Sequence, residues 1–132
     1  MIFIDASAII SIVDGEDDAI ALAARLPEAS PTYISPVVLY EAVTGLARKR
    51  AAPIEVAERS IEIFIAQTNA QMIEITAEIG LNAIEAFKKF GRGRHKAGLN
   101  MGDCFAYACA KAHNLPLLFK GSDFPYTDIE SA

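Results

Sequence analysis

Four acidic side chains, far apart along the chain, could together do chemistry: Asp5, Glu41, Asp103 and Asp123. Asp5 directly follows a short apolar run typical of a buried strand, and Asp123 follows another behind a glycine turn. Carboxylates that gather in one place repel each other unless a cation neutralises them. Oxygen ligands without Cys or His favour Mg²⁺ or Mn²⁺ over zinc. The pattern therefore predicts a divalent-metal site of the kind that hydrolyses phosphodiester bonds.

Each acid also has an ordinary structural interpretation. Asp5 and Asp103 stand where helices are expected to begin, and Asp there caps free backbone N–H groups. Asp123 lies in a turn, where Asp is common. Glu41 lies on the polar stripe of its expected helix, as a surface glutamate would. The metal-site hypothesis therefore depends on the four acids coming together.

The elements that must position these acids alternate along the chain. Short apolar strands are expected at 2–4, within 31–36, at 72–75 and at 117–119. Helices are expected at 5–13, 19–26, 37–50, 53–70, 76–90 and 104–112. Strands alternating with longer helices are typical of an α/β domain with a short, mostly parallel central sheet flanked by helices. Because ligands bind at the carboxyl ends of parallel strands, at least three of the acids should meet at that edge.

Length and composition predict one domain over residues 1–132, long enough to bury a continuous core. The chain begins without a basic leader, and no apolar run approaches the ~20 residues of a membrane span. We therefore expect a cytoplasmic protein that does not enter a membrane. Cys104 and Cys109 point to different sides of their helix and are expected to be reduced core residues.

The charge is unevenly distributed. The net charge of −5 argues against a general nucleic-acid-binding surface, but eight of the twelve Lys and Arg fall within 48–50 and 88–96. The segment 91–98 is rich in glycine and cations, so it is either a flexible arm that meets phosphates or a solvated linker. His95 in it is expected to be a phosphate contact or a bystander. The expected RNA phosphate contacts are Arg48, Arg92, Arg94 and Lys96.

Several segments, taken in order, carry a resemblance to a known family. They are Phe3–Ala8, Glu41, Gly91–His95, Leu99–Ala108 and Gly121–Phe124. In order, spacing and total length they resemble the PIN-domain ribonucleases of the VapC type, toxins of type II toxin–antitoxin pairs. The resemblance covers nearly the whole chain and implies a single PIN-like α/β domain.

This resemblance implies roles for particular residues. Asp5 and Asp103 match the acids tied most directly to Mg²⁺ or Mn²⁺, and Glu41 and Asp123 complete the acidic quartet. Ser7 and Asn100 match supporting polar positions. The resemblance also implies cleavage of RNA such as tRNA, a homodimer, and a small VapB-type antitoxin that inserts basic side chains among the carboxylates.

Three other functional classes share parts of this pattern. A phosphoacceptor receiver domain needs paired acids after its first strand, but Ala6 follows Asp5. A haloacid-dehalogenase-type phosphatase needs a second Asp where Ser7 stands. A catalytically idle PIN-like module that only binds RNA or a protein remains open.

Overall fold

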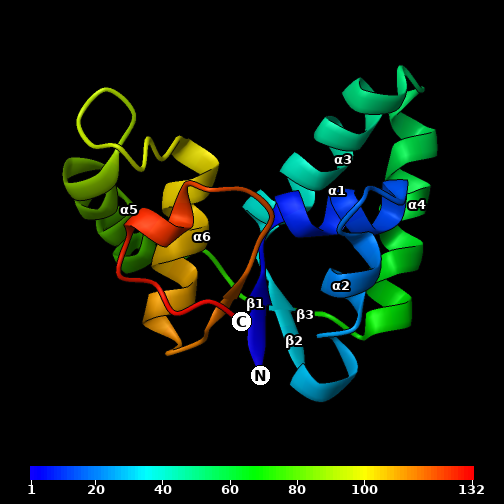
Figure 1. Cartoon of the computed structure of the whole chain (residues 1–132), viewed down its shortest axis with the longest axis horizontal. Coiled ribbons are helices and arrows are strands. Elements are labelled where there is room, and N and C mark those ends of the chain that lie inside the picture. Colours follow the sequence, from blue (N-terminus) through cyan, green and yellow to red (C-terminus); the bar gives the residue numbers. More distant parts are fainter.

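Four short parallel strands form the centre of the computed structural model, which describes all 132 residues (Figure 1). The strands are β1 (Ile2–Ile4), β2 (Thr32–Ile34), β3 (Gln71–Met72) and β4 (Leu117–Leu118). Their order is β3-β2-β1-β4, and every neighbouring pair is parallel. The predicted α/β class with a parallel sheet is confirmed. The two central strands of the sheet, β2 and β1, bring the residues that follow them to the carboxyl edge of the sheet.

Burial on both faces explains the apolar run of β1. All three of its residues are buried, as expected when helices cover both sides of a parallel sheet. The strand expected at 72–75 is instead β3, where both residues are exposed at the sheet edge. Ile73 still donates its N–H to the Ile34 carbonyl at 2.7 Å, but the chain then leaves the sheet to begin the next helix.

Six α-helices surround the sheet: α1 (Ala6–Asp14), α2 (Ala19–Ala23), α3 (Pro36–Arg50), α4 (Ile54–Thr68), α5 (Ala77–Phe90) and α6 (Met101–Ala112). Figure 1 shows α1 to α4 on one side of the sheet and the pair α5 and α6 on the other. Two short 3₁₀ turns occupy Pro27–Ala29 and Phe124–Tyr126. None of the six helices has the length and apolar composition to cross a membrane.

Local side-chain chemistry sets most helix boundaries. Ser35 begins α3 by accepting the Val38 N–H, and Thr76 begins α5 by accepting the Ile79 N–H, each at 3.2 Å. The helix expected at 19–26 ends at Ala23, although Ala24 and Leu26 keep helical backbone angles up to the 3₁₀ turn at Pro27–Ala29. Gly91 ends α5 in an extended conformation with φ −67°, not in the left-handed one common at helix ends.

Helix α6 packs between α5 and the sheet. Most of its residues are buried, including Cys104 and Cys109, which are free thiols as predicted. Exposure along this helix is confined mainly to Met101, Lys111 and Ala112 at its ends. The C-terminal residues close the molecule by pairing Ser131 with Leu117 in β4.

Candidate active site

Asp5 lies at the carboxyl end of β1 and begins α1. Its Oδ2 accepts the Ser7 N–H at 3.1 Å and the Ser7 hydroxyl at 2.5 Å. The residue is only 4% exposed, and burial raises the pKa of its carboxyl, although the bonds from Ser7 and Ala6 oppose the rise. Asp5 is therefore a helix cap, as its ordinary interpretation predicts, and also a buried acid at the ligand-binding edge.

Ser7 connects two parts of the chain at this edge. While its hydroxyl donates to Asp5, its Oγ accepts the backbone N–H of Lys120 at 3.0 Å. The turn after β1 is thereby tied to the loop after β4. That position agrees with the supporting place that the resemblance implies for Ser7.

Asp103 and Asn100 form a reciprocal cap at the start of α6. Asn100 Oδ1 accepts the Asp103 N–H at 2.9 Å, and Asp103 Oδ2 accepts the Asn100 N–H at 3.1 Å. Burial, and then the charges of Asp5 and Asp123, raise the pKa of Asp103 to about 6, although the Asn100 hydrogen bond and the charge of Arg92 lower it. Asp103 is thus a structural cap within the field of other acids.

Glu41 reaches the same acids from α3. Its partly buried carboxylate lies against the backbone of Gly102 in α6, in space that a β-carbon on Gly102 would fill. Burial, and then the charges of Asp5 and Asp103, raise the pKa of Glu41 to about 7. The interpretation of Glu41 as an ordinary surface glutamate is therefore wrong, because α3 packs against α6 at this point.

Asp123 occupies the loop after β4, directly before the 3₁₀ turn Phe124–Tyr126. It is exposed, and its side chain makes no capping hydrogen bond. Its charge still raises the pKa of Asp103. It is the most peripheral of the four acids.

None of the four carboxylates forms an ion pair, since every ion pair in the structure involves other acids. Burial is the main cause of the raised pKa values at Asp5, Glu41 and Asp103, and the charges of neighbouring acids add to it at Glu41 and Asp103. No group of three or more His, Cys, Asp or Glu side chains is placed to hold an ion directly. The donors suit a hard divalent cation chemically, with water completing its coordination.

The basic segment 91–98 is a closed loop. Leu99 donates its N–H to the Phe90 carbonyl at 2.9 Å, and Arg92 donates to the Leu99 carbonyl at 3.0 Å. His95 Nδ1 accepts the Ala97 N–H at 3.0 Å, and its ring meets Phe90 edge-on. The segment is therefore held by its own hydrogen bonds instead of forming a linker. His95 has a structural role that sequence reasoning missed.

The four cations expected to meet phosphates are all exposed. Arg92 lies close enough to Asp103 to lower its pKa, and Arg94 Nε donates to the Lys88 carbonyl at 3.3 Å. Lys96 lies 4.9 Å from the centre of the Tyr126 ring. Arg48 does not lie in this loop but at the C-terminal end of α3.

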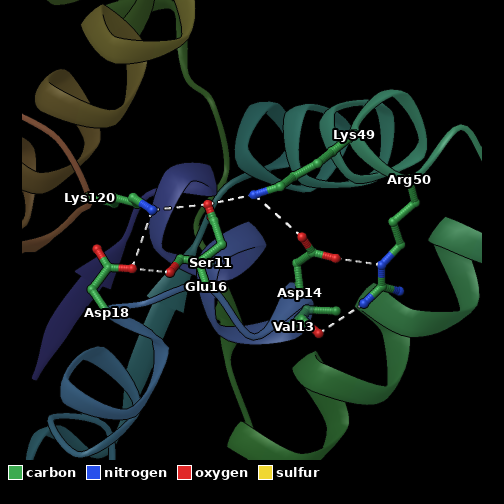
Figure 2. A network of polar contacts seen from close by, with 8 residues as sticks. All are labelled: Ser11, Val13, Asp14, Glu16, Asp18, Lys49, Arg50 and Lys120. Carbon is green, nitrogen blue, oxygen red and sulfur yellow. Dashed lines mark hydrogen bonds and ion pairs between the residues drawn. The ribbon is translucent and has the colours of Figure 1, made fainter.

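A network of charged residues around the end of α1 was not expected from the sequence (Figure 2). Glu16 Oε1 accepts from Lys49 Nζ at 2.6 Å and from Lys120 Nζ at 3.0 Å. Asp14 pairs with Arg50 at 2.8 Å, and Asp18 accepts the Ser11 hydroxyl. Asp14, Glu16 and Asp18 are therefore tied into ion pairs and hydrogen bonds and are not merely solvated. Their partners lie in α3 and after β4, too far along the chain for local spacing to reveal them.

Comparison with known proteins decides the family. A family model described as "PIN domain" matches residues 2–130. The chain belongs to the PIN-domain family. Among curated PIN-domain relatives, a VapC ribonuclease of Rhizobium meliloti is 37% identical over 98% of this chain and 99% of its own length. Ribonuclease VapC30 of Mycobacterium tuberculosis is 33% identical over 96% of this chain and 94% of its own length. The resemblance to the VapC type is confirmed.

Solved structures show the same fold. The VapC20 structure from Mycobacterium tuberculosis, described as a "Sarcin-Ricin loop cleaving toxin", superposes with a TM-score of 0.76 at 20% identity, covering 100% of this chain and 98% of that one. VapBC2 from Rickettsia felis, bound to a DNA fragment from its promoter, gives a TM-score of 0.72 at 18% identity with the same coverage. This PIN domain therefore has the architecture of known VapC proteins.

Proposed function

We propose that this PIN domain is a metal-dependent endoribonuclease that acts as the toxin of a type II toxin–antitoxin pair. One observation carries the proposal. Asp5, Glu41 and Asp103 come from three separate segments, and none of them forms an ion pair. Burial raises the pKa of all three, and the charge of Asp5 raises the pKa of both Glu41 and Asp103 further. Relatives at 32–37% identity named VapC ribonucleases support RNA as the substrate, with tRNA the expected class.

Asp5 and Asp103 are the residues we assign to a Mg²⁺ or Mn²⁺ ion, with Glu41 and Asp123 completing the acidic set. A bound ion of this kind activates water and stabilises the attacking and leaving oxygens of an in-line displacement. Ser7 holds the Asp5 carboxylate in one orientation through its paired hydrogen bonds. Hydrogen bonding of this kind limits the motion of a ligand and so prepares it for binding.

Asn100 does the same for Asp103 through the reciprocal cap at the start of α6. In the ion-free protein the Glu41 carboxyl holds its proton up to about pH 7, which relieves the repulsion among the acids. Arg92, beside Asp103, adds a positive charge where an approaching phosphate would otherwise meet only carboxylates.

We further propose a VapB-like antitoxin as partner, a homodimer as the assembly, and the cytoplasm as the location. Two structural neighbours are toxin–antitoxin complexes by their descriptions, from Klebsiella pneumoniae and Rickettsia felis. Carboxylates without positive partners are a natural target for an inhibitor's basic side chains. Exposed apolar residues such as Tyr40, Leu81 and Ile84 give the domain surface of the kind that protein partners cover.

The direct test uses the purified domain free of antitoxin. RNA should be cleaved when Mg²⁺ or Mn²⁺ is added and not in chelator. Asp5→Asn and Asp103→Asn should each abolish cleavage while unfolding remains cooperative, because Asn can still accept the capping bonds. The matched control is Asp17→Asn, an exposed acid with no ion pair, which should cleave normally.

Retained cleavage in both variants would remove the acidic site from the mechanism. RNA binding without any cleavage by the wild-type protein would favour the idle RNA-binding module instead. Sequencing the RNA ends formed when the domain is expressed briefly alone would identify the target.

A further inference from the structure

A polar pocket lies beside the acidic site, between α1, the C-terminal end of α3 and the loop after β4. Its volume is about 490 Å³. Its lining includes three cations, Arg48, Lys49 and Lys120, together with Ser7 and Glu16. Only Arg48 was among the expected phosphate contacts.

The charges of this pocket favour an anion. Lys49 and Lys120 come from distant segments, yet both ammonium groups converge on the same oxygen, Oε1 of Glu16 (Figure 2). Lys49 also pairs with Asp14 and Lys120 with Asp18, each at 3.4 Å, but neither of these acids lines the pocket. Glu16 is the one acid in the lining, and Arg48 makes no ion pair. The charged residues that line the pocket therefore leave it positive, on a chain whose net charge is −5.

The pocket is also accessible. The side chains of Lys49 and Lys120 are 39% and 38% exposed, so their pairs with Glu16 are weak and can rearrange at little cost. The backbone at Gly121 is open, with no atom within 4 Å of where a β-carbon would stand. An anion can thus approach the lysines without displacing packed groups.

Ser7 connects this pocket to the acids. It lines the pocket and at the same time donates to Asp5, and its Oγ accepts the Lys120 N–H. The cations therefore stand next to the acid at the end of β1, and an RNA strand that passes the acids also passes them. A positive pocket there offsets the repulsion between the carboxylates and the RNA backbone.

We propose that this pocket seats a backbone phosphate of the RNA strand next to the cleavage site, held by Lys49, Lys120 and Arg48. Glu16 keeps the two lysines together in the free protein and competes with the phosphate for them. The proposal rests on the ribonuclease function proposed above. It assigns to Lys49, Lys120 and Glu16 a role in RNA binding that involves no contact with the reacting atoms.

The test measures binding of a fluorescein-labelled, mixed-sequence 20-nucleotide RNA by anisotropy, in chelator so that no cleavage occurs. For single strands, each phosphate contact contributes about 0.7 to the slope of log affinity against log salt. A Lys49→Gln/Lys120→Gln double variant should bind several-fold more weakly at low salt, with a slope shallower by roughly 0.7 to 1.4. The matched control is Arg25→Gln/Arg59→Gln, which removes two exposed charges elsewhere and should change the slope little.

The Glu16→Gln variant distinguishes competition with the RNA phosphate from a purely structural role of Glu16. If Glu16 competes with phosphate, this variant should bind the RNA more tightly than wild type, even if thermal unfolding shows that it is less stable. Equal slopes for the lysine variant and the arginine control, or weaker binding by Glu16→Gln, would overturn the proposal. The ribonuclease proposal is judged separately, by cleavage of RNA by the wild-type domain with Mg²⁺.

Discussion

The carboxylate of Glu41 occupies the space beside the Gly102 backbone that a β-carbon would need. This contact joins α3 to the first turn of α6 and brings Glu41 within the field of Asp5 and Asp103. A glycine in the first turn of a buried helix has a clear physical reason here. It is the only residue type that leaves room for the acid.

Gly102→Ala should therefore impair cleavage more than folding. The new methyl group would push the Glu41 carboxylate aside, and a displacement of about 1 Å at a reacting centre can cost on the order of 10²-fold in rate. Gly80→Ala in α5 is the control, since nothing lies within 4 Å of its added carbon. The control should keep full activity and gain roughly 0.5–1 kcal/mol of stability. Equal cleavage rates for both variants would contradict this account.

Stability of the metal-free domain should fall as pH rises from about 5 to 8. The pKa values of Glu41 and Asp103 are raised to about 7 and about 6, so the folded chain binds more protons than the unfolded chain in this window. In the Glu41→Gln variant the free energy of unfolding should fall less with pH. At pH 8 this variant should be on the order of 1 kcal/mol more stable than wild type. Urea unfolding at several pH values measures the difference, and a steeper fall in Glu41→Gln would disprove it.

Added Mg²⁺ should reverse this loss at pH 8. An ion that binds only the folded chain raises the free energy of unfolding by mass action. The shift in the urea midpoint should grow with Mg²⁺ concentration in the wild-type domain and be much smaller in Asp5→Asn. The same midpoint in both proteins at every Mg²⁺ concentration would argue against an ion at these acids.

Replacing Arg92, Arg94 and Lys96 together by alanine should weaken RNA cleavage and reduce its dependence on salt. These side chains are exposed, while the loop is closed by backbone hydrogen bonds that the substitutions keep. The expected change is a higher KM with a shallower salt slope and an unchanged unfolding midpoint. An unchanged KM would show that the segment 91–98 has a structural role and does not contact the RNA.

Tyr107→Phe should destabilise the domain without affecting the acids. The buried Tyr107 hydroxyl donates to Asp128, which also pairs with Lys111 at 3.2 Å, so the C-terminal segment is held to α6. Losing one hydrogen bond to a charged group that stays largely exposed should cost about 1 kcal/mol. Thermal unfolding measures the loss, and cleavage at 25 °C should remain at the wild-type rate.

Local patterns predicted much of the fold. The apolar run at Ile2–Ile4 and the helix start at Thr76 each carry their signal within a few residues. The predicted ends of helices and strands were wrong where the sequence carries no local signal for them. The strand expected at 72–75 is cut short as the chain turns into α5, and α2 ends at Ala23 although Ala24 and Leu26 keep helical backbone angles.

The candidate site was predictable only in part. Asp5 and Asp103 stand at element boundaries that the sequence marks, so their placement near the sheet edge could be expected. The burial of Glu41 depends on how α3 crosses α6, which helical periodicity in α3 alone does not contain. The pairing of Glu16 with Lys120 spans 104 positions, and no local rule connects residues so far apart.

Asp5 and Asp103 each complete the first hydrogen bonds of a helix. Fraying of either helix end by one turn would therefore disperse the acids while most of the hydrophobic core stayed intact. Loss of cleavage on warming should then set in below the melting temperature of the domain, so that enzyme assays would report local opening before spectroscopy detects global unfolding.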